Sequence, residues 1–130
     1  MDEKKIIGTH KGLTRIKEFT IDEVFGWINE TEKTVLWADD KYSIKSKMLY
    51  RARIYAEKGM NCAECGLEGS FFALERDKGG GMHLDLYGRN ETQDVMMTID
   101  HIHPSSKGGK HHVDNFQTMC KICNEKKADN

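Results

Sequence analysis

The four cysteines of the chain form two short pairs with one spacing, Cys62-x-x-Cys65 and Cys120-x-x-Cys123. Two such pairs supply the four thiolates that a single tetrahedral Zn²⁺ ion requires. Residues 66–119 separate the pairs, so a whole subdomain must fold between them. Redox-active dithiols and simple buried cysteines are the alternatives. We favour structural zinc because both pairs share one spacing and every cysteine is used.

A second pattern is Asp100-His101, at the end of an apolar segment that we expect to be a strand. A carboxylate beside a histidine places a hard oxygen ligand next to a base. Neighbouring side chains of a regular strand point to opposite faces. If both residues serve one site, the strand must therefore break here, and Pro104 supports such a break. An isolated Asp-His pair is common by chance and carries little weight.

The pair begins an ordered series of short motifs: Asp100-His101-Ile102-His103-Pro104, Ser106-Lys107-Gly108-Gly109, Asp114-Asn115, Cys120-x-x-Cys123-Asn124 and Lys127. In order and spacing, residues 60–127 resemble the HNH endonuclease family. The resemblance implies a ββα-metal core, two strands and a helix around one divalent ion. The C-x-x-C-Asn arrangement is similar to that of phage junction-resolving endonucleases. The Lys-Gly-Gly loop is more like that of HNH nucleases from phages and mobile elements.

The resemblance also implies a role for each matching residue. His101 would be the general base that activates water, and Asn115 would hold the loop that orients it. Asp100 and Asn124 would bind a catalytic Mg²⁺ or Mn²⁺ ion, since oxygen ligands favour these metals over zinc. Lys127 would lie near the scissile phosphate. Asn124 directly follows Cys123, so the zinc site would also set where the catalytic helix begins.

These roles predict a metal-dependent endonuclease that hydrolyses DNA. Two alternatives stay open at this stage. One is the same nuclease acting on RNA or branched DNA, and the other is a catalytically silent zinc module that binds nucleic acid or protein. The simultaneous presence of Asp100, His101, Asn115 and Asn124 argues against the silent module. Residues 1–59 match no pattern with a known role, and they can recognise substrate, contact a protein partner or complete the core.

Charge and composition constrain the class of protein. The 130 residues include 32% charged side chains and carry a net charge of −1. No apolar run approaches the roughly 20 residues needed to cross a membrane, and no signal-peptide pattern follows Met1, so we expect a cytoplasmic protein (host cytoplasm, if phage-encoded). The segment from His101 to Lys127, however, contains five lysines and only two acidic residues. Such a local basic patch can hold phosphate on a nearly neutral protein.

We expect an α+β fold with an N-terminal extension at 1–59 and a nuclease domain at 60–130. A capping box, Thr20 with Glu23, predicts a helix over 21–30. Ser43 as N-cap and Gly59 at the C-terminal end predict a second helix over 44–58. Strands are expected at 33–37, 71–74, 82–87, 94–102 and 115–119, with a terminal helix after Cys120.

Overall fold

The computed structural model describes residues 5–7, 13–30, 32–37, 39–103, 108 and 113–128. The expected α+β class is confirmed. Among these residues, three α-helices and two short 3₁₀ helices accompany the strands: α1 (Ile21–Phe25), η1 (Ser46–Leu49), α2 (Tyr50–Lys58), η3 (Val113–Asn115) and α3 (Lys121–Ala128). The strands are β1 (Lys5–Ile7), β2 (Thr14–Thr20), β3 (Glu32–Trp37), β4 (Asp40–Lys45), β5 (Gly69–Arg76), β6 (Met82–Arg89), β7 (Gln93–His101) and β8 (Phe116–Cys120).

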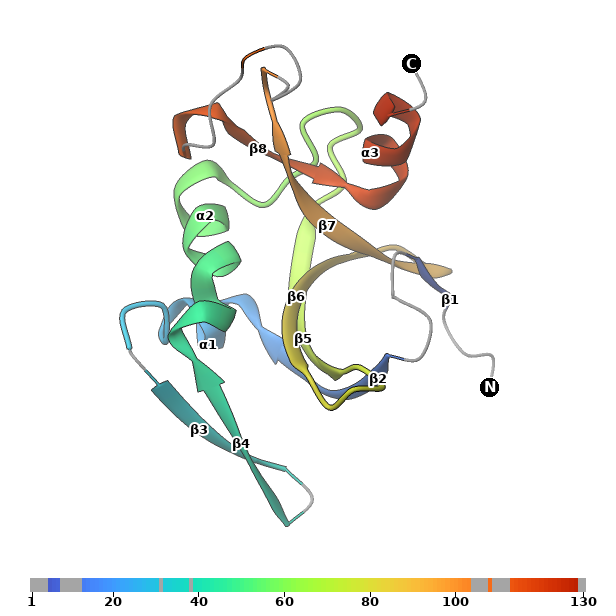
Figure 1. Cartoon of the computed structure of the whole chain (residues 1–130). Coiled ribbons are helices and arrows are strands. Elements are labelled where there is room, and N and C mark those ends of the chain that lie inside the picture. The colour runs from blue at the N-terminus through green and yellow to red at the C-terminus, as the bar shows by residue number, and fades with distance from the viewer. Residues whose placement is uncertain are drawn as a thin grey trace.

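A curved sheet with the strand order β1-β7-β6-β5-β2 forms the centre of the molecule, and β8 pairs with the far end of β7 (Figure 1). Strands β3 and β4 form a separate hairpin that projects from the body. Both β1 and β2 belong to the central sheet, since β1 pairs with β7 and β2 with β5. Residues before 60 therefore share a sheet with residues after 60, while the division at 59/60 stays a prediction.

The long strand β7 changes its antiparallel partner along its length. Its first part pairs with β6, with Asp94 opposite Arg89 and Met96 opposite Tyr87. Its second part pairs with β8, from Met97 opposite Cys120 to His101 opposite Phe116. The strand thus carries the chain from the central sheet to the β8–α3 unit, which is where the ββα core was expected.

One face of the sheet forms the main hydrophobic core. Alternate residues such as Phe72 and Leu74 of β5 and Leu86 of β6 point to this face, as the two-residue period of a strand requires. Helix α2 packs there through Ala52 and Tyr55. Burial of such side chains contributes about 1.5–3 kcal/mol each, and it fixes α2 against the sheet just before the first cysteine pair.

The predicted helix over 44–58 is wrong in its first part. Residues 40–45 form strand β4, residues 46–49 form η1, and α2 begins only at Tyr50. Gly59 does follow the helix with a φ of 97°, a conformation that glycine adopts without steric cost. The end of the helix was therefore predicted correctly, but its start was not.

Ser43 is a strand residue rather than a helix cap. It lies opposite Thr34 in the hairpin, and its hydroxyl donates a hydrogen bond to Glu32 at 3.0 Å. Ile44, which was expected on the buried face of a helix, is fully buried from β4. A short apolar–polar alternation fits a strand as well as the start of a helix, and pairing with β3 decides between them.

The remaining elements follow the predictions with shifted ends. The capping box is present, with Thr20 accepting from the Glu23 N–H and Glu23 accepting from the Thr20 N–H, but α1 stops at Phe25 instead of residue 30. The predicted strands near 33–37, 71–74, 82–87, 94–102 and 115–119 correspond to β3, β5, β6, β7 and β8. In the described part of the chain, no helix has the length and apolar character to cross a membrane.

Candidate functional site

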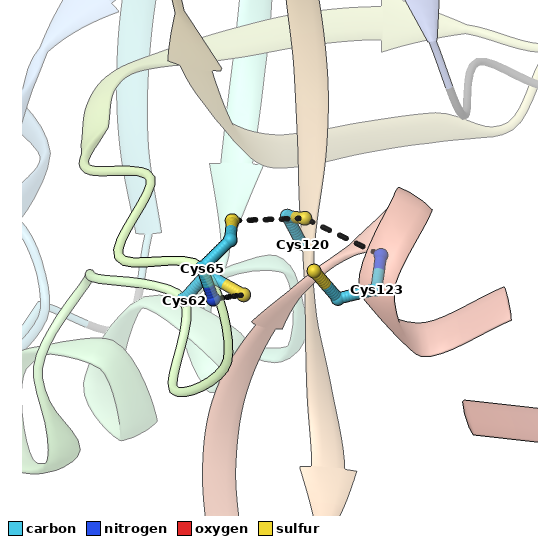
Figure 2. Close-up of side chains that lie close together, drawn as sticks. All are labelled: Cys62, Cys65, Cys120 and Cys123. Atoms are coloured by element: carbon cyan, nitrogen blue, oxygen red, sulfur yellow. Dashed lines mark hydrogen bonds between the residues drawn. The ribbon is translucent and has the colours of Figure 1, made fainter. Parts of the chain in front are cut away.

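The four cysteines converge on one point, although they come from two distant parts of the chain. Cys62 and Cys65 lie in the loop after α2, Cys120 ends β8, and Cys123 lies in the first turn of α3. Figure 2 shows the four thiols turned toward one another. All four sulfur atoms lie within 4.8 Å of one another. The sequence prediction that the two pairs form one metal-binding cluster is confirmed.

The spacing and chemistry of the cluster fit a zinc ion. Sγ of Cys65 lies 3.8 Å from Sγ of Cys120. Sulfurs at the corners of a tetrahedron around Zn²⁺, at about 2.3 Å from the metal, would be separated by about 3.8 Å. The N–H of Cys65 points to the sulfur of Cys62 and the N–H of Cys123 to that of Cys120, each at 3.5 Å. Both hydrogen bonds favour thiolates, the form that a metal binds.

The thiol pKa values show why a cation suits this cluster. Burial raises the pKa of Cys62, but backbone N–H groups outweigh burial and lower its pKa to about 6. Burial, followed by hydrogen bonding to the neighbouring thiols, raises the pKa of Cys123 to about 12. The raised pKa of Cys123 keeps this thiol protonated at neutral pH unless a positive charge compensates its ionisation. A divalent cation removes this conflict, because a coordinating thiol is deprotonated outright.

Two hydrogen bonds connect the first cysteine pair to β8. The N–H of Ala63 donates to the carbonyl of Thr118 at 2.9 Å. The buried hydroxyl of Thr118 donates to the carbonyl of Gly59 at 2.5 Å. The loop that carries Cys62 and Cys65 is thereby held against the strand that ends at Cys120.

The C-terminal helix places two polar side chains over β7. The Nδ2 group of Asn124 donates to the hydroxyl of Thr98 at 2.8 Å, and this hydroxyl donates to the carbonyl of Met119 at 2.7 Å. One turn later, the Lys127 ammonium lies 2.5 Å from the carboxylate of Asp100. Residues 98 and 100 lie on the same face of a strand, so α3 covers the face that carries Asp100.

Asp100 is half-buried and has two partners. Its Oδ2 atom accepts from Lys127 and, at 3.1 Å, from the side-chain amide of Gln117. Gln117 lies directly opposite Asp100 in the β7–β8 register. Lys127 also donates to the carbonyl of His101 at 3.2 Å. The Asp100 carboxylate is thus already paired with one positive charge, the Lys127 ammonium. It also offers the kind of oxygen ligand that a divalent metal ion prefers.

His101 is the last residue of β7 and is half-buried. Its ring packs edge-on against Phe116, with 5.3 Å between the ring centroids and an interplanar angle of 86°. Phe116 is its partner in the β7–β8 register. His101 therefore lies on the face of the ribbon opposite to Asp100. The sequence analysis required the strand to break at this pair if both residues serve one site, but both belong to β7. The strand ends at this residue, and a bend at Ile102 and His103 follows.

Asn115 holds the backbone just beyond His101. Its Oδ1 atom accepts from the N–H of His103 at 2.8 Å, and its Nδ2 group donates to the carbonyl of His103 at 3.0 Å. Its own carbonyl accepts from the N–H of Ile102 at 2.8 Å. Three hydrogen bonds to two successive residues fix the path of the chain as it leaves β7, and hence the orientation of the terminal histidine.

The structure thus gathers the predicted residues around the end of β7. Asp100, Asn124 and Lys127 lie on the face of the β7–β8 ribbon that α3 covers. His101 lies on the other face, and Asn115 is hydrogen-bonded to the bend that follows β7. Sequence reasoning missed Thr98 and Gln117, which contact Asn124 and Asp100. The two-residue period of β7 indicates Thr98, but the β7–β8 register that selects Gln117 is not visible in sequence. Pro104, Lys107, Lys110, His111 and His112 lie outside the described residues.

A family model described as HNH endonuclease matches residues 86–130. Residues 86–130 are therefore similar to the HNH endonuclease family, and they are called the HNH segment below. Searches of curated proteins and of solved structures gave no match. The HNH segment runs from β6 to the end of the chain and contains Asp100, His101, Asn115, Asn124 and Lys127. It covers about a third of the chain and excludes Cys62 and Cys65, so half of the four-cysteine cluster comes from outside it.

Proposed function

We propose that this protein is a metal-dependent nuclease that hydrolyses phosphodiester bonds in DNA. One observation supports the proposal: the HNH segment contains the acid, the base and both asparagines, and Asn124 and Asn115 form hydrogen bonds within three residues of the C-terminal end of β7, where Asp100 and His101 lie. A purely structural zinc module has no need of this polar group. The four-cysteine cluster would hold a structural Zn²⁺ ion, which implies a compartment that keeps thiols reduced, and we place the protein in the cytoplasm.

His101 is proposed as the general base. Its imidazole would take a proton from a water molecule as the water oxygen forms a bond to phosphorus, and the bond to the ester oxygen breaks. The leaving oxygen then takes a proton from solvent. The contact with Phe116 limits the rotation of the ring, and the hydrogen bonds from Asn115 to His103 limit movement of the backbone. Positioned proton transfer of this kind contributes typically about 10²–10⁴-fold in rate.

Asp100 and Asn124 would hold the divalent ion, Mg²⁺ or Mn²⁺. The Nδ2 group of Asn124 is engaged by Thr98, so its amide oxygen is the atom suited to bind a cation. When bound, the ion would neutralise charge on the phosphoryl oxygens. Lys127, on the same side of β7, would add a second positive charge near the phosphate.

The two faces of β7 guide where we place the scissile phosphate. Asp100 and His101 occupy opposite faces of the β7–β8 ribbon, so a phosphate on either face would reach only one of them. A phosphate at the end of β7, next to the bend at Ile102, is accessible to side chains from both faces. We therefore place the reacting group at the strand terminus and not in a cavity above the sheet.

Cleavage by the wild-type protein and by His101→Ala tests the proposal. Both proteins, at matched zinc content, are dialysed free of Mg²⁺ and assayed with and without added Mg²⁺ or Mn²⁺. Linear DNA, branched DNA and RNA serve as substrates. We expect metal-dependent cleavage of DNA by the wild type and a loss of about 10²–10⁴-fold in His101→Ala, with unchanged thermal unfolding.

Each other outcome has a clear meaning. Equal cleavage by the two proteins would show that His101 is not the base. Cleavage confined to RNA or to branched DNA would support the proposed hydrolysis but show that linear DNA is not the substrate. A wild type that binds nucleic acid but cleaves none of the three substrates would support the silent zinc module instead.

A further inference from the structure

A groove lies between the β3–β4 hairpin and strand β6, on residues that the proposed chemistry does not use. Strand β7 pairs with β6 only at residues 87–89 and then turns away toward β8. Beside the stretch of β6 that β7 leaves, two hollows of about 660 and 530 Å³ share Ser43, Lys45 and Met82 as lining residues. The two hollows together are called the hairpin groove below.

The hairpin groove is strongly basic for a chain with a net charge of −1. Two acidic residues, Asp40 and Asp85, line it, against five basic residues: Lys41, Lys45, Lys47, Arg51 and Arg76. Arg51 and Asp85 lie 3.7 Å apart and largely cancel each other. The remaining side chains leave a clear excess of positive charge, which concentrates anions in a concave surface.

The positive side chains converge from several elements, which distinguishes this groove from an ordinary solvated face. Lys41 and Lys45 lie on β4, Lys47 on η1, Arg51 on α2 and Arg76 on β5. On β4, Lys41, Ser43 and Lys45 share one face, while Ile44 on the other face is fully buried. The alternation that buries Ile44 thus leaves the two lysines of β4 exposed beside the groove.

Two tyrosines accompany these charges. Tyr50 lines the groove and has 50% of its surface exposed. The guanidinium of Arg76 lies 5.8 Å from the ring centroid of Tyr42, and both residues line the groove. Basic side chains with an exposed aromatic ring are the combination that binds nucleic-acid strands, through phosphate contacts and base stacking. An acidic protein partner would be bound by the basic side chains of the groove, and the exposed tyrosine ring would have no role in that binding.

The groove and the proposed site share strand β7. Met96 lines the groove, and His101 ends the same strand five residues later. At about 3.4 Å per residue, the two residues are separated by about 17 Å. One phosphodiester strand advances about 3.4 Å of helix axis per phosphate, so a strand held at His101 reaches the groove about five nucleotides away.

We propose that the hairpin groove is a second contact surface for the nucleic-acid substrate, which binds backbone phosphates about five nucleotides from the cleaved bond. The inference rests on the proposed nuclease function and assigns a substrate-binding role to residues before the HNH segment. Phosphate contacts do not read sequence, so the groove adds affinity and fixes the position of the strand without selecting a target sequence.

The test compares two double variants of equal charge change. Lys45→Gln with Lys47→Gln alters the groove, whereas Lys58→Gln with Lys78→Gln removes two exposed lysines that do not line it. Binding of a DNA duplex two helical turns long, about 70 Å, is measured over a range of salt concentrations, with each double variant in a His101→Ala background. Thermal unfolding checks that both variants are folded.

We expect the groove variant to bind more weakly, on the order of 10-fold per lost contact at 0.1 M salt, and the slope of log affinity against log salt to fall by up to about 2. The control variant should bind like its parent. Equal affinities and slopes in the two variants would overturn the inference, and an acidic protein would then be the better candidate for the groove.

A small diester separates this inference from the proposed function. With His101 intact, bis(p-nitrophenyl) phosphate is too short to reach the groove, so the groove variant should cleave it at the wild-type rate. If the wild type does not cleave it or any nucleic acid, the nuclease proposal fails. If cleavage is normal and the groove variant binds DNA as tightly as the control variant, only the groove inference fails. A groove variant that loses cleavage of the small diester would also overturn the inference, since its lysines would then act on the chemistry.

Discussion

The ammonium group of Lys127 lies 2.5 Å from the Asp100 carboxylate, the group that the proposed mechanism assigns to the catalytic metal ion. The two residues are joined across the interface between α3 and β7. A lysine and a divalent cation cannot both occupy the same side of one carboxylate oxygen. A divalent ion that bound to the Oδ2 atom of Asp100 would therefore compete with Lys127 for that oxygen.

Replacement of Lys127 by methionine should therefore separate metal affinity from rate. The Lys127 side chain is 40% exposed, and exposed ion pairs contribute about 0.2–1 kcal/mol. We expect Lys127→Met to lower the Mg²⁺ concentration that gives half-maximal cleavage by about 1.5- to 5-fold. The maximal rate should fall, because a positive charge near the phosphate is lost. Lys58→Met, on another helix, is the control and should change neither quantity. An increased Mg²⁺ requirement in Lys127→Met would show that the lysine assists the metal.

Asn115 should act on the rate only through the backbone that follows His101. Asn115→Ala removes both side-chain hydrogen bonds to His103. We expect a rate between those of the wild type and His101→Ala, with a loss of up to about 10²-fold from the misplaced base. Hydrogen exchange of the His103 amide should become faster, a change that a direct chemical role would not predict.

Asn90→Ala is a matched control for Asn115→Ala. The side chain of Asn90 accepts from the backbone N–H groups of Thr92 and Gln93, at 3.0 and 2.8 Å, in the turn between β6 and β7. Both substitutions remove a side chain that holds a turn, but only Asn115 lies beside the proposed site. Equal loss of rate in the two variants would indicate that turn stability, and not the position of His101, limits cleavage.

Removal of zinc should unfold the C-terminal half of the protein. Structural zinc contributes about 10–16 kcal/mol in small peptides, comparable with the whole stability of a domain, about 5–15 kcal/mol. We expect one zinc per chain by metal analysis. A strong chelator should cause loss of protection from hydrogen exchange over residues 60–127, restored by added Zn²⁺. A folded preparation with less than half an equivalent of zinc would contradict the assignment.

A buried ion-pair network should make stability depend on Asp94. Its side chain is 3% exposed and accepts from Arg15 and Arg89 at 3.1 and 3.0 Å. Burial alone would raise the pKa of Asp94, but the hydrogen bonds from Arg89 and Arg15 outweigh burial and hold the pKa below 3.8. Asp94→Asn leaves Glu18 and Glu75 as the remaining carboxylates beside Arg15 and Glu18 beside Arg89. The loss of the charged hydrogen bonds of Asp94 should cost about 1–3 kcal/mol at neutral pH.

The sign of the pH dependence follows from the lowered pKa of Asp94. Its ion pairs stabilise the fold fully above pH 3.8, and this contribution is lost as the pH falls through the lower folded-state value. Denaturant titrations should therefore show the difference between wild type and Asp94→Asn narrowing below pH 3.8. Asp39→Asn, in an exposed turn, should change stability by less than about 0.5 kcal/mol. A difference that does not vary with pH would mean that packing, not charge, is lost.

Much of the candidate site could be predicted from local sequence. The spacing of the two cysteine pairs predicted one cluster, and the order of Asp100, His101, Asn115 and Asn124 indicated the HNH segment. The capping box at Thr20 and the end of α2 at Gly59 were also predicted correctly. These features depend on residues a few positions apart, whose relative geometry the backbone itself limits.

The tertiary structure decided what depends on contacts between distant segments. The hairpin replaced the predicted start of a helix because β3 pairs with β4. Gln117 faces Asp100 only because β7 and β8 pair in one register, and the hairpin groove exists only because β7 leaves β6. Strand pairing joins residues whose separation along the chain no local pattern encodes, and a shift of one residue would reverse every side chain. The sequence by itself therefore determined which side chains are available for chemistry, and the long-range strand pairing decided which of them meet.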